Sequence, residues 1–273
     1  MVIYDPGSAV DTAAPAVLKV RRPSIRGFTS VADRAGLDDA WTREGQALSR
    51  LRGTAGVVQL LDVSEVGGAP AYRLLMAKGT PLANSYVGEP WSLSAVRRIM
   101  ARVAAAVNRM HSSGWLHLDL NPSNVMFDRE SESVTLLDLG ASAPVGSHAT
   151  WSWPLGRHVF MAPEQLAVCA EHPGPERGPG ADVYQLAFLA AFLLTGKHPF
   201  RSCGDGDYRF DYLPSVLRWS QLPGHAKVSF VSRARPDLPG WTIELLAACA
   251  DPRPERRMEV SAFERAMLKG AMT

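Results

Sequence analysis

The stretch HLDLNPSNVMFD, residues 117–128, places Asp119 and Asn124 on either side of Pro122, directly before an apolar run. A proline at this position excludes a regular helix, so both polar side chains lie on a loop that leads into a strand. Polar side chains on a rigid loop beside a strand are a common construction for an active site. Taken alone, the spacing is more typical of a solvated turn. The rest of the chain decides between these two interpretations.

The composition describes an ordinary globular chain of 273 residues, of which 46% are hydrophobic and 21% charged, with a net charge of +2. This charge balance predicts neither nucleic acid nor an anionic membrane as a main partner. Arginine far outnumbers lysine and alanine is abundant, which indicates a GC-rich bacterial genome. The three cysteines are widely spaced. They fit neither a disulfide framework nor a zinc site, and they favour a reducing compartment, the cytoplasm.

The chain shows no pattern for membrane insertion. Its first residues lack the basic region and apolar core of a signal peptide, so none is expected. The longest apolar run, 183–196, contains Gln185 and is too short to cross a bilayer. It predicts a buried core helix.

Hydrophobic periodicity divides the chain into a β-rich front and a helical back. The front predicts strands at 2–5, 16–20, 57–63 and 71–77 and a helix at 37–53, with the turn SEVGGAP at 64–70. The back predicts a helix at 92–114 with Ser92 as its N-cap, then strands at 124–128 and 134–140. Further helices are expected at 181–196 and near 241–250 and 259–269, with a loop-rich region at 200–240. The predicted domains are therefore 1–78 and 79–273.

Seven segments resemble the motifs of the protein kinase family and occur in the family's order. They are AVLKV (16–20), REGQALSRL (43–51), HLDLNPSN (117–124), DLG (138–140), MAPE (161–164), DVYQLAFLAAFLLTGKHPF (182–200) and DPRPERRM (251–258). Each short motif alone is common, but seven in the correct order and context are specific. The resemblance spans residues 2–269. It implies an α+β, two-lobed kinase-like fold with a small N-lobe of sheet plus one helix and a mainly α-helical C-lobe.

The resemblance implies ATP and Mg²⁺ as cofactors and assigns roles to five residues. Lys19 holds the nucleotide phosphates, and Glu44 fixes the position of Lys19. Asp119 accepts or orients the proton of the substrate hydroxyl. Asn124 and Asp138 bind the magnesium ion, since this hard cation prefers oxygen ligands.

Five further site residues follow from the same resemblance. Val17, Met76 and Met126 are expected to contact the nucleotide. Asn121 stands where the family carries a lysine near the γ-phosphate, and Arg157 where it carries a threonine. We hypothesise that Arg157 supplies the lost charge while Asn121 orients the substrate hydroxyl.

The resemblance also predicts contacts with structural roles. Glu164 and Arg257 are expected to form a buried ion pair in the C-lobe. His117 is expected to be a packed, hydrogen-bonded loop residue rather than a catalytic base. Trp151 and Trp153 are expected to anchor the activation segment.

Besides Asn121 and Arg157, two further departures from the family weaken the analogy. The segment MVIYD aligns with the strand after the family's glycine-rich loop, so the given sequence starts too late to contain that loop. Either the true start lies upstream, or the kinase is abbreviated and is expected to bind nucleotide less tightly. Leu118 replaces the arginine of H-R-D, which in the family meets a phosphate on the activation segment. Switching by phosphorylation is therefore not expected.

The favoured function is ATP- and magnesium-dependent phosphoryl transfer to serine or threonine of a protein or peptide substrate, the activity of a serine/threonine-protein kinase. The alternative is a pseudokinase scaffold that binds a partner protein through the C-lobe. The intact Lys19, Glu44, Asp119, Asn124 and Asp138 favour the enzyme, whereas the missing loop and Asn121 favour the scaffold. A third interpretation is a small-molecule kinase, because the D-L-x-P-x-N loop also resembles aminoglycoside phosphotransferases.

Overall fold

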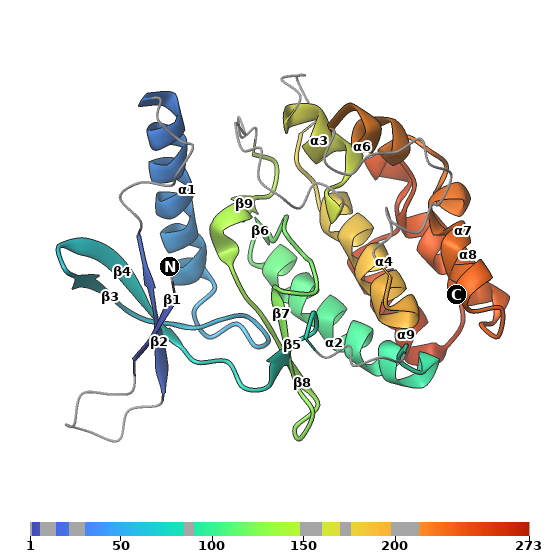
Figure 1. Cartoon of the computed structure of the whole chain (residues 1–273), viewed down its shortest axis with the longest axis horizontal. Helices are drawn as coiled ribbons and strands as arrows, with labels where there is room; N and C mark the ends of the chain where they lie inside the picture. The colour runs from blue at the N-terminus through green and yellow to red at the C-terminus, as the bar shows by residue number, and fades with distance from the viewer. Residues whose placement is uncertain are drawn as a thin grey trace.

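The computed structural model describes residues 2–5, 15–21, 31–84, 90–147, 160–169, 176–197 and 213–272. These residues form a smaller part, built from a sheet and one long helix, and a larger part built mainly from helices (Figure 1). The α+β, two-lobed architecture expected from the sequence is confirmed.

The smaller part is a four-stranded antiparallel sheet in the order β1-β2-β4-β3, accompanied by the helix α1 (Val31–Arg50). Its strands are β1 (Val2–Asp5), β2 (Ala16–Val20), β3 (Leu60–Val66) and β4 (Ala69–Leu75). The hairpin β3–β4 is tighter than predicted. Gly67 and Gly68 have φ of 58° and 79°, which glycine adopts without steric cost, so two residues suffice for the turn.

The larger part is organised around α4 (Gly180–Thr195), whose residues are nearly all buried. Helices α2 (Leu93–Ser112), α8 (Gly240–Cys249) and α9 (Val260–Lys269) pack against it. The predicted N-cap of α2 is confirmed, since Ser92 Oγ accepts a hydrogen bond from Ala95 N at 3.3 Å. No helix in the described part of the chain has the length and apolar character needed to cross a membrane.

The prediction of a loop-rich region at 200–240 is wrong for residues 213–234. This segment forms α6 (Leu213–Ser220) and α7 (Gly224–Ala234). Pro223 is the N-cap of α7, and a proline at a helix start removes no intrahelical bond. The buried Val228 and Val231 have helical spacing. Residues 198–212 lie outside the described residues.

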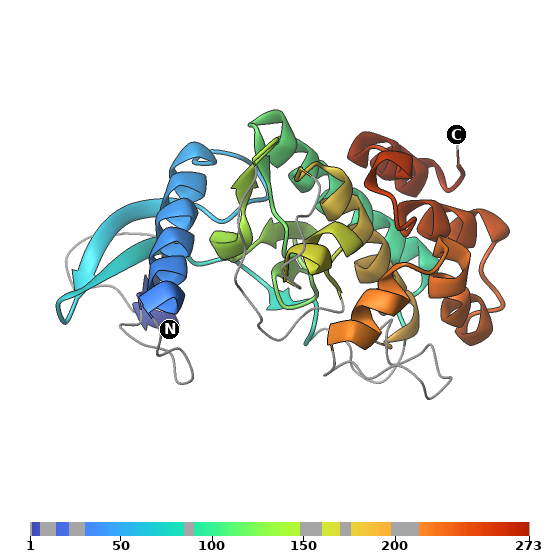
Figure 2. The ribbon, with the colours of Figure 1, turned by 90° about the horizontal axis from the view of Figure 1, so that it is seen from above.

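Short strands between the two parts carry the polar loops. One sheet has the order β5 (Thr80–Pro81), β7 (Val125–Asp128) and β8 (Ser133–Leu136), and β6 (Trp115–Leu116) pairs with β9 (Ala143–Pro144). The 3-10 turn η1 (Leu139–Ala141) follows β8. Both views place these teal-to-green segments between the blue-to-teal sheet with its helix α1 and the orange-red helices (Figures 1 and 2).

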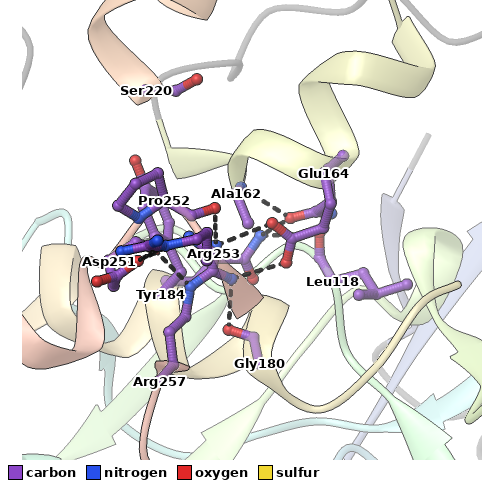
Figure 3. Close-up of polar contacts among 12 residues, drawn as sticks. Leu118, Ala162, Glu164, Gly180, Tyr184, Ser220, Asp251, Pro252, Arg253 and Arg257 are labelled. Atoms are coloured by element: carbon purple, nitrogen blue, oxygen red, sulfur yellow. Dashed lines mark hydrogen bonds and ion pairs between the residues drawn. The ribbon is translucent and has the colours of Figure 1, made fainter. Parts of the chain in front are cut away.

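An ion pair fixes α3 (Pro163–Cys169) to the segment around η3 (Pro254–Arg256). Arg257 donates from Nη1 to Glu164 Oε1 at 2.7 Å and from Nη2 to Oε2 at 2.9 Å (Figure 3). Both side chains are buried, so the predicted buried Glu164–Arg257 pair is confirmed.

Candidate active site

Lys19 connects the smaller part of the molecule to the polar loops. Its Nζ lies 2.5 Å from Glu44 Oε1 on α1 and 2.8 Å from Asp138 Oδ1 after β8. Burial alone would lower the pKa of Lys19, but the two carboxylates outweigh this effect and raise it. For Asp138, burial would raise the pKa, but Lys19 lowers it. Lys19 and Asp138 are therefore both charged at neutral pH.

The D-L-G turn presents the Asp138 carboxylate to the lysine. Asp138 has φ 57° and ψ 78°, and its side chain accepts a hydrogen bond from Gly140 N. A Cβ at position 140 would lie 3.2 Å from Asp138 Oδ1, which is tighter than ordinary contact, and 3.7 Å from Glu44 Oε2. Glycine at this position therefore lets the Asp138 carboxylate approach the backbone of the turn.

Two asparagines hold Asp119. Asn124 Nδ2 donates to Asp119 Oδ2 at 2.7 Å and to its backbone oxygen at 2.9 Å. Asn121 Nδ2 donates to Asp119 Oδ1 and to the same backbone oxygen, both at 3.0 Å. Each carboxylate oxygen thus accepts from one amide, which fixes the orientation of the carboxylate. The structure places Asn121 against Asp119 with only 2% of its surface exposed.

The backbone around Asp119 is anchored on α4. The fully buried Asp182 accepts hydrogen bonds from His117 N at 2.9 Å and from Leu118 N at 2.7 Å. It also contacts His111 Nε2 at 2.8 Å. Burial would raise the pKa of Asp182, but these partners lower it, so it serves as a buried anion. His117 is itself fully buried, with Nε2 3.1 Å from Leu137 O. It is a packed loop histidine, as the sequence predicts.

The loop and the D-L-G turn meet at one end of the β7–β8 pair. Leu137 N donates to Asn124 O at 2.8 Å, directly after the Val125–Leu136 pair of the register. Asn124 and Asp138 therefore project from neighbouring strand ends. Because the amide nitrogen of Asn124 faces Asp119, its Oδ1 is the atom that would contact a cation.

This donor set fits magnesium held jointly with a nucleotide. The described residues contain no group of three or more acidic, histidine or cysteine side chains that could hold a metal alone. Magnesium is commonly bound by one or two carboxylates together with substrate phosphates. Asp138 and Asn124 supply oxygen ligands of this kind.

The remaining predicted residues are placed as follows. Val17 lies in β2, Met76 directly follows β4, and Met126 lies in β7; all three side chains are half-buried. Met76 N donates to Pro15 O at 2.9 Å, which joins this segment to the start of β2. Arg157, Trp151 and Trp153 lie outside the described residues.

Three residues that sequence reasoning missed fix the position of Glu44. The rings of Trp41 and Tyr72 stack at 4.2 Å and 10°, and Tyr72 Oη donates to Trp41 O at 2.8 Å. Tyr72 lies opposite Lys19 in the β2–β4 register, and burial followed by Glu44 raises its pKa to about 12. Gly45 lets α1 approach this ring. A glycine inside a helix is unfavourable, so Gly45 was the signal in the sequence that could have indicated a close packing contact at this position.

If the site turns over ATP, as the resemblance noted in the sequence implies, Gly45→Ala is expected to reduce kcat/KM for ATP about tenfold. The added Cβ would lie 2.5 Å from Tyr72 Oη, so either the Tyr72 ring or α1 must shift. The ring is held by its stack on Trp41 and its hydrogen bond to Trp41 O, so we expect α1 to shift and the Lys19–Glu44 pair to lengthen. Steady-state kinetics measures the change. Gly240→Ala is the matched control, because no atom lies within 4 Å of its Cβ. Tyr72→Phe removes the clashing oxygen, so the double variant with Gly45→Ala should partly recover kcat/KM. Equal kinetics in all variants would contradict the role of Trp41, Tyr72 and Gly45 in fixing the position of Glu44.

Comparisons with known proteins agree with this geometry. The protein kinase domain family matches residues 26–267. The citron Rho-interacting kinase of Mus musculus is 30% identical over 137 residues, which are 50% of this chain and 7% of that protein. Two Myxococcus xanthus proteins are also similar. The serine/threonine-protein kinase Pkn1 is 29% identical over 56% of this chain and 22% of its own length, and pkn2 is 25% identical over 84% and 27%. The chain thus spans less than a third of these relatives.

Proposed function

Because this chain belongs to the protein kinase family, we propose that it transfers the γ-phosphoryl group of ATP to a serine or threonine hydroxyl of a protein or peptide. The contact of Lys19 with both Glu44 and Asp138 carries the proposal. It joins the two parts of the molecule at one charged centre beside the Asp119 loop. Relatives named as serine/threonine-protein kinases support the substrate class.

The chemistry requires positioning and charge neutralisation more than covalent participation. The substrate hydroxyl oxygen attacks the γ-phosphorus, ADP leaves, and Asp119 takes the hydroxyl proton. Lys19 contacts the α- and β-phosphates, and Glu44 keeps its ammonium in place. Asn124 and Asp138 would hold magnesium, which neutralises the phosphate charge when bound.

The nucleotide would lie between a smaller domain, 1–78, and a larger domain, 79–273. Val17, Met76 and Met126 are proposed to line its base, and Arg157 to add positive charge near the transferred phosphoryl group. A protein or peptide substrate and a cytoplasmic location complete the proposal. A second candidate is a pseudokinase scaffold with a partner on the C-lobe. It is favoured by Asn121, an amide where the family has a cation.

The test combines nucleotide binding with turnover. A ligand at a hundredfold excess over its Kd should stabilise the folded chain by about 2.7 kcal/mol, so ATP with Mg²⁺ should raise Tm. Asp138→Asn should remove most of this shift, whereas Asp62→Asn, an exposed residue of β3 paired with Arg73, should not. Transfer of labelled phosphate to a serine/threonine peptide library measures turnover. Neither a shift nor transfer in the wild type would support the scaffold instead.

Asn121→Leu is expected to lower kcat about tenfold while KM for ATP stays unchanged. The change removes one of the two amides that orient the Asp119 carboxylate but touches none of the residues proposed to bind ATP. Asn84→Leu, at an exposed position after β5, is the matched control. A larger change in KM than in kcat would show that Asn121 acts on nucleotide binding instead.

A further inference from the structure

Leu118, directly before Asp119, has an unusual backbone. Its φ is 65°, in the left-handed region that leucine rarely occupies, and its side chain is 1% exposed. Such a conformation persists only where the surroundings over-determine it. Asp182 holds the Leu118 N–H, and the carbonyl of Leu118 needs partners of its own.

Two glutamines provide those partners. Gln165 Nε2, from α3, donates to Leu118 O at 2.9 Å, and Gln185 Nε2, from α4, donates to the same oxygen at 3.0 Å. Gln185 Oε1 also accepts from Leu120 N at 2.7 Å. The Gln185 side chain therefore forms hydrogen bonds to the backbone on both sides of Asp119.

The same two side chains reach the M-A-P-E segment, 161–164. Gln165 Oε1 accepts from Ala162 N at 3.0 Å and from Gln185 Nε2 at 3.1 Å. An unbroken chain of amides thus runs from the backbone of Ala162 to the loop that carries Asp119. Gln185 is 1% exposed, and buried networks in which each polar group is bonded are rigid.

We infer that Gln165 and Gln185 are positioning residues that couple the M-A-P-E segment to the Asp119 loop, and that neutral amides carry this coupling. The inference rests on the proposed function, because the loop's alignment matters through Asp119. Leu118 offers no cationic side chain to a phosphate. On this inference the alignment of the loop does not depend on a phosphorylated residue.

The kinetic test uses Gln165→Leu, Gln185→Leu and the double variant, with the exposed Gln221→Leu as control. Leucine is close in volume and suits the apolar helix α4, but it cannot bond the loop. Each single variant should lower kcat about tenfold or more with KM for ATP unchanged. The double variant should lose no more kcat than the worse single variant, because the two side chains bond each other and act as one network. If the two side chains had only independent structural roles, the effects of the two single variants would add in the double variant, both on kcat and on Tm.

Hydrogen exchange tests the coupling without any need for turnover. The Leu120 amide should exchange faster in Gln185→Leu, and the loop 117–124 faster in Gln165→Leu, but neither in Gln221→Leu. Unchanged exchange and unchanged kcat in both glutamine variants would overturn the inference. An inactive wild type with faster exchange in the variants would overturn the proposed function alone. If Gln185→Leu does not fold, Gln165→Leu on the short helix α3 still decides.

Phosphatase treatment tests the neutral character of the coupling. The kcat of the treated wild type should match that of the untreated protein within twofold. A tenfold or greater loss, restored by rephosphorylation, would overturn the claim that amides alone align the loop.

Discussion

Glu164→Ala is expected to lower the free energy of unfolding by about 3–5 kcal/mol, because it leaves the buried guanidinium of Arg257 without its counter-charge. The pair is bidentate, at 2.7 and 2.9 Å, and the side-chain exposures are 4% for Glu164 and 0% for Arg257. Solvent therefore cannot replace the lost carboxylate. The resemblance to the protein kinase family predicts this pair, from two motifs whose paired residues lie 93 positions apart.

The other contacts of Arg257 prevent it from escaping to solvent. It donates to Asp251 O at 2.8 Å and to Gly180 O at 2.9 Å, and its Cζ lies 4.9 Å from the centre of the Tyr184 ring (Figure 3). Two segments, the loop at Asp251 and the helix α4, thus hold the cation in place after Glu164 is lost. The full cost of an unpaired buried charge is therefore expected.

Urea denaturation of matched variants measures the effect. Asp237→Ala removes the exposed partner of Arg235 and should change the unfolding free energy by less than about 1 kcal/mol. Glu164→Gln keeps the shape of the side chain and part of the hydrogen bonding. Its loss of unfolding free energy should therefore lie between those of Glu164→Ala and Asp237→Ala. A loss below about 1 kcal/mol for Glu164→Ala would show that the pair contributes no more than a surface pair.

The order of motifs predicts which residues of the site meet, but not how they are held. Lys19, Glu44 and Asp138 are recognisable because the motifs around them resemble those of the protein kinase family, and their residue types suit the chemistry of phosphate and magnesium. The Trp41–Tyr72 stack is not, because it depends on which faces of a helix and a strand pack together. Periodicity constrains that choice only loosely.

Gln185 is an intermediate case. A glutamine inside the apolar run 183–196 indicates a buried polar group that must be bonded. Its partners, Leu118 O and Leu120 N, lie 67 and 65 residues away and cannot be read from local sequence. The helices at 213–234 were missed for a local reason, because proline and glycine at a helix start give the same signal as a loop.

The burial of Lys227 is the feature that is hardest to predict from the sequence. It lies beside Val228 in an amphipathic segment, yet it is fully buried. Its Nζ donates to Ser220 O at 2.8 Å, contacts Tyr184 Oη at 3.5 Å and lies 4.7 Å from the centre of the Tyr184 ring. Burial, followed by repulsion from Arg257, lowers the pKa of Lys227 to about 7, against an attraction from Asp251 and Glu164 that is weaker.

This lowered pKa makes stability depend on pH in a defined direction. The ordinary pKa of a lysine is 10.5, so between pH 7 and 10.5 the unfolded chain holds a proton at Lys227 that the folded chain has released. Stability then rises with pH across this range, since the unfolded state binds more protons. Below pH 7 the contribution is constant. At pH 7 the difference in pKa corresponds to a cost of roughly 4 kcal/mol.

Lys227→Met is therefore expected to raise the free energy of unfolding by about 3 kcal/mol at pH 7. The removed charge cost is partly offset by the hydrogen bond that Ser220 O loses, about 1 kcal/mol. Urea denaturation of both proteins from pH 7 to 10.5 gives the difference directly, so groups common to both cancel. The advantage of the variant should shrink steadily as pH rises and vanish or reverse near pH 10.5. Lys269→Met, at an exposed position, should show neither effect. If Lys227→Met is less stable than the wild type at every pH, the ammonium of Lys227 is stabilised by its partners, and the lysine strengthens the contact between α7 and α4.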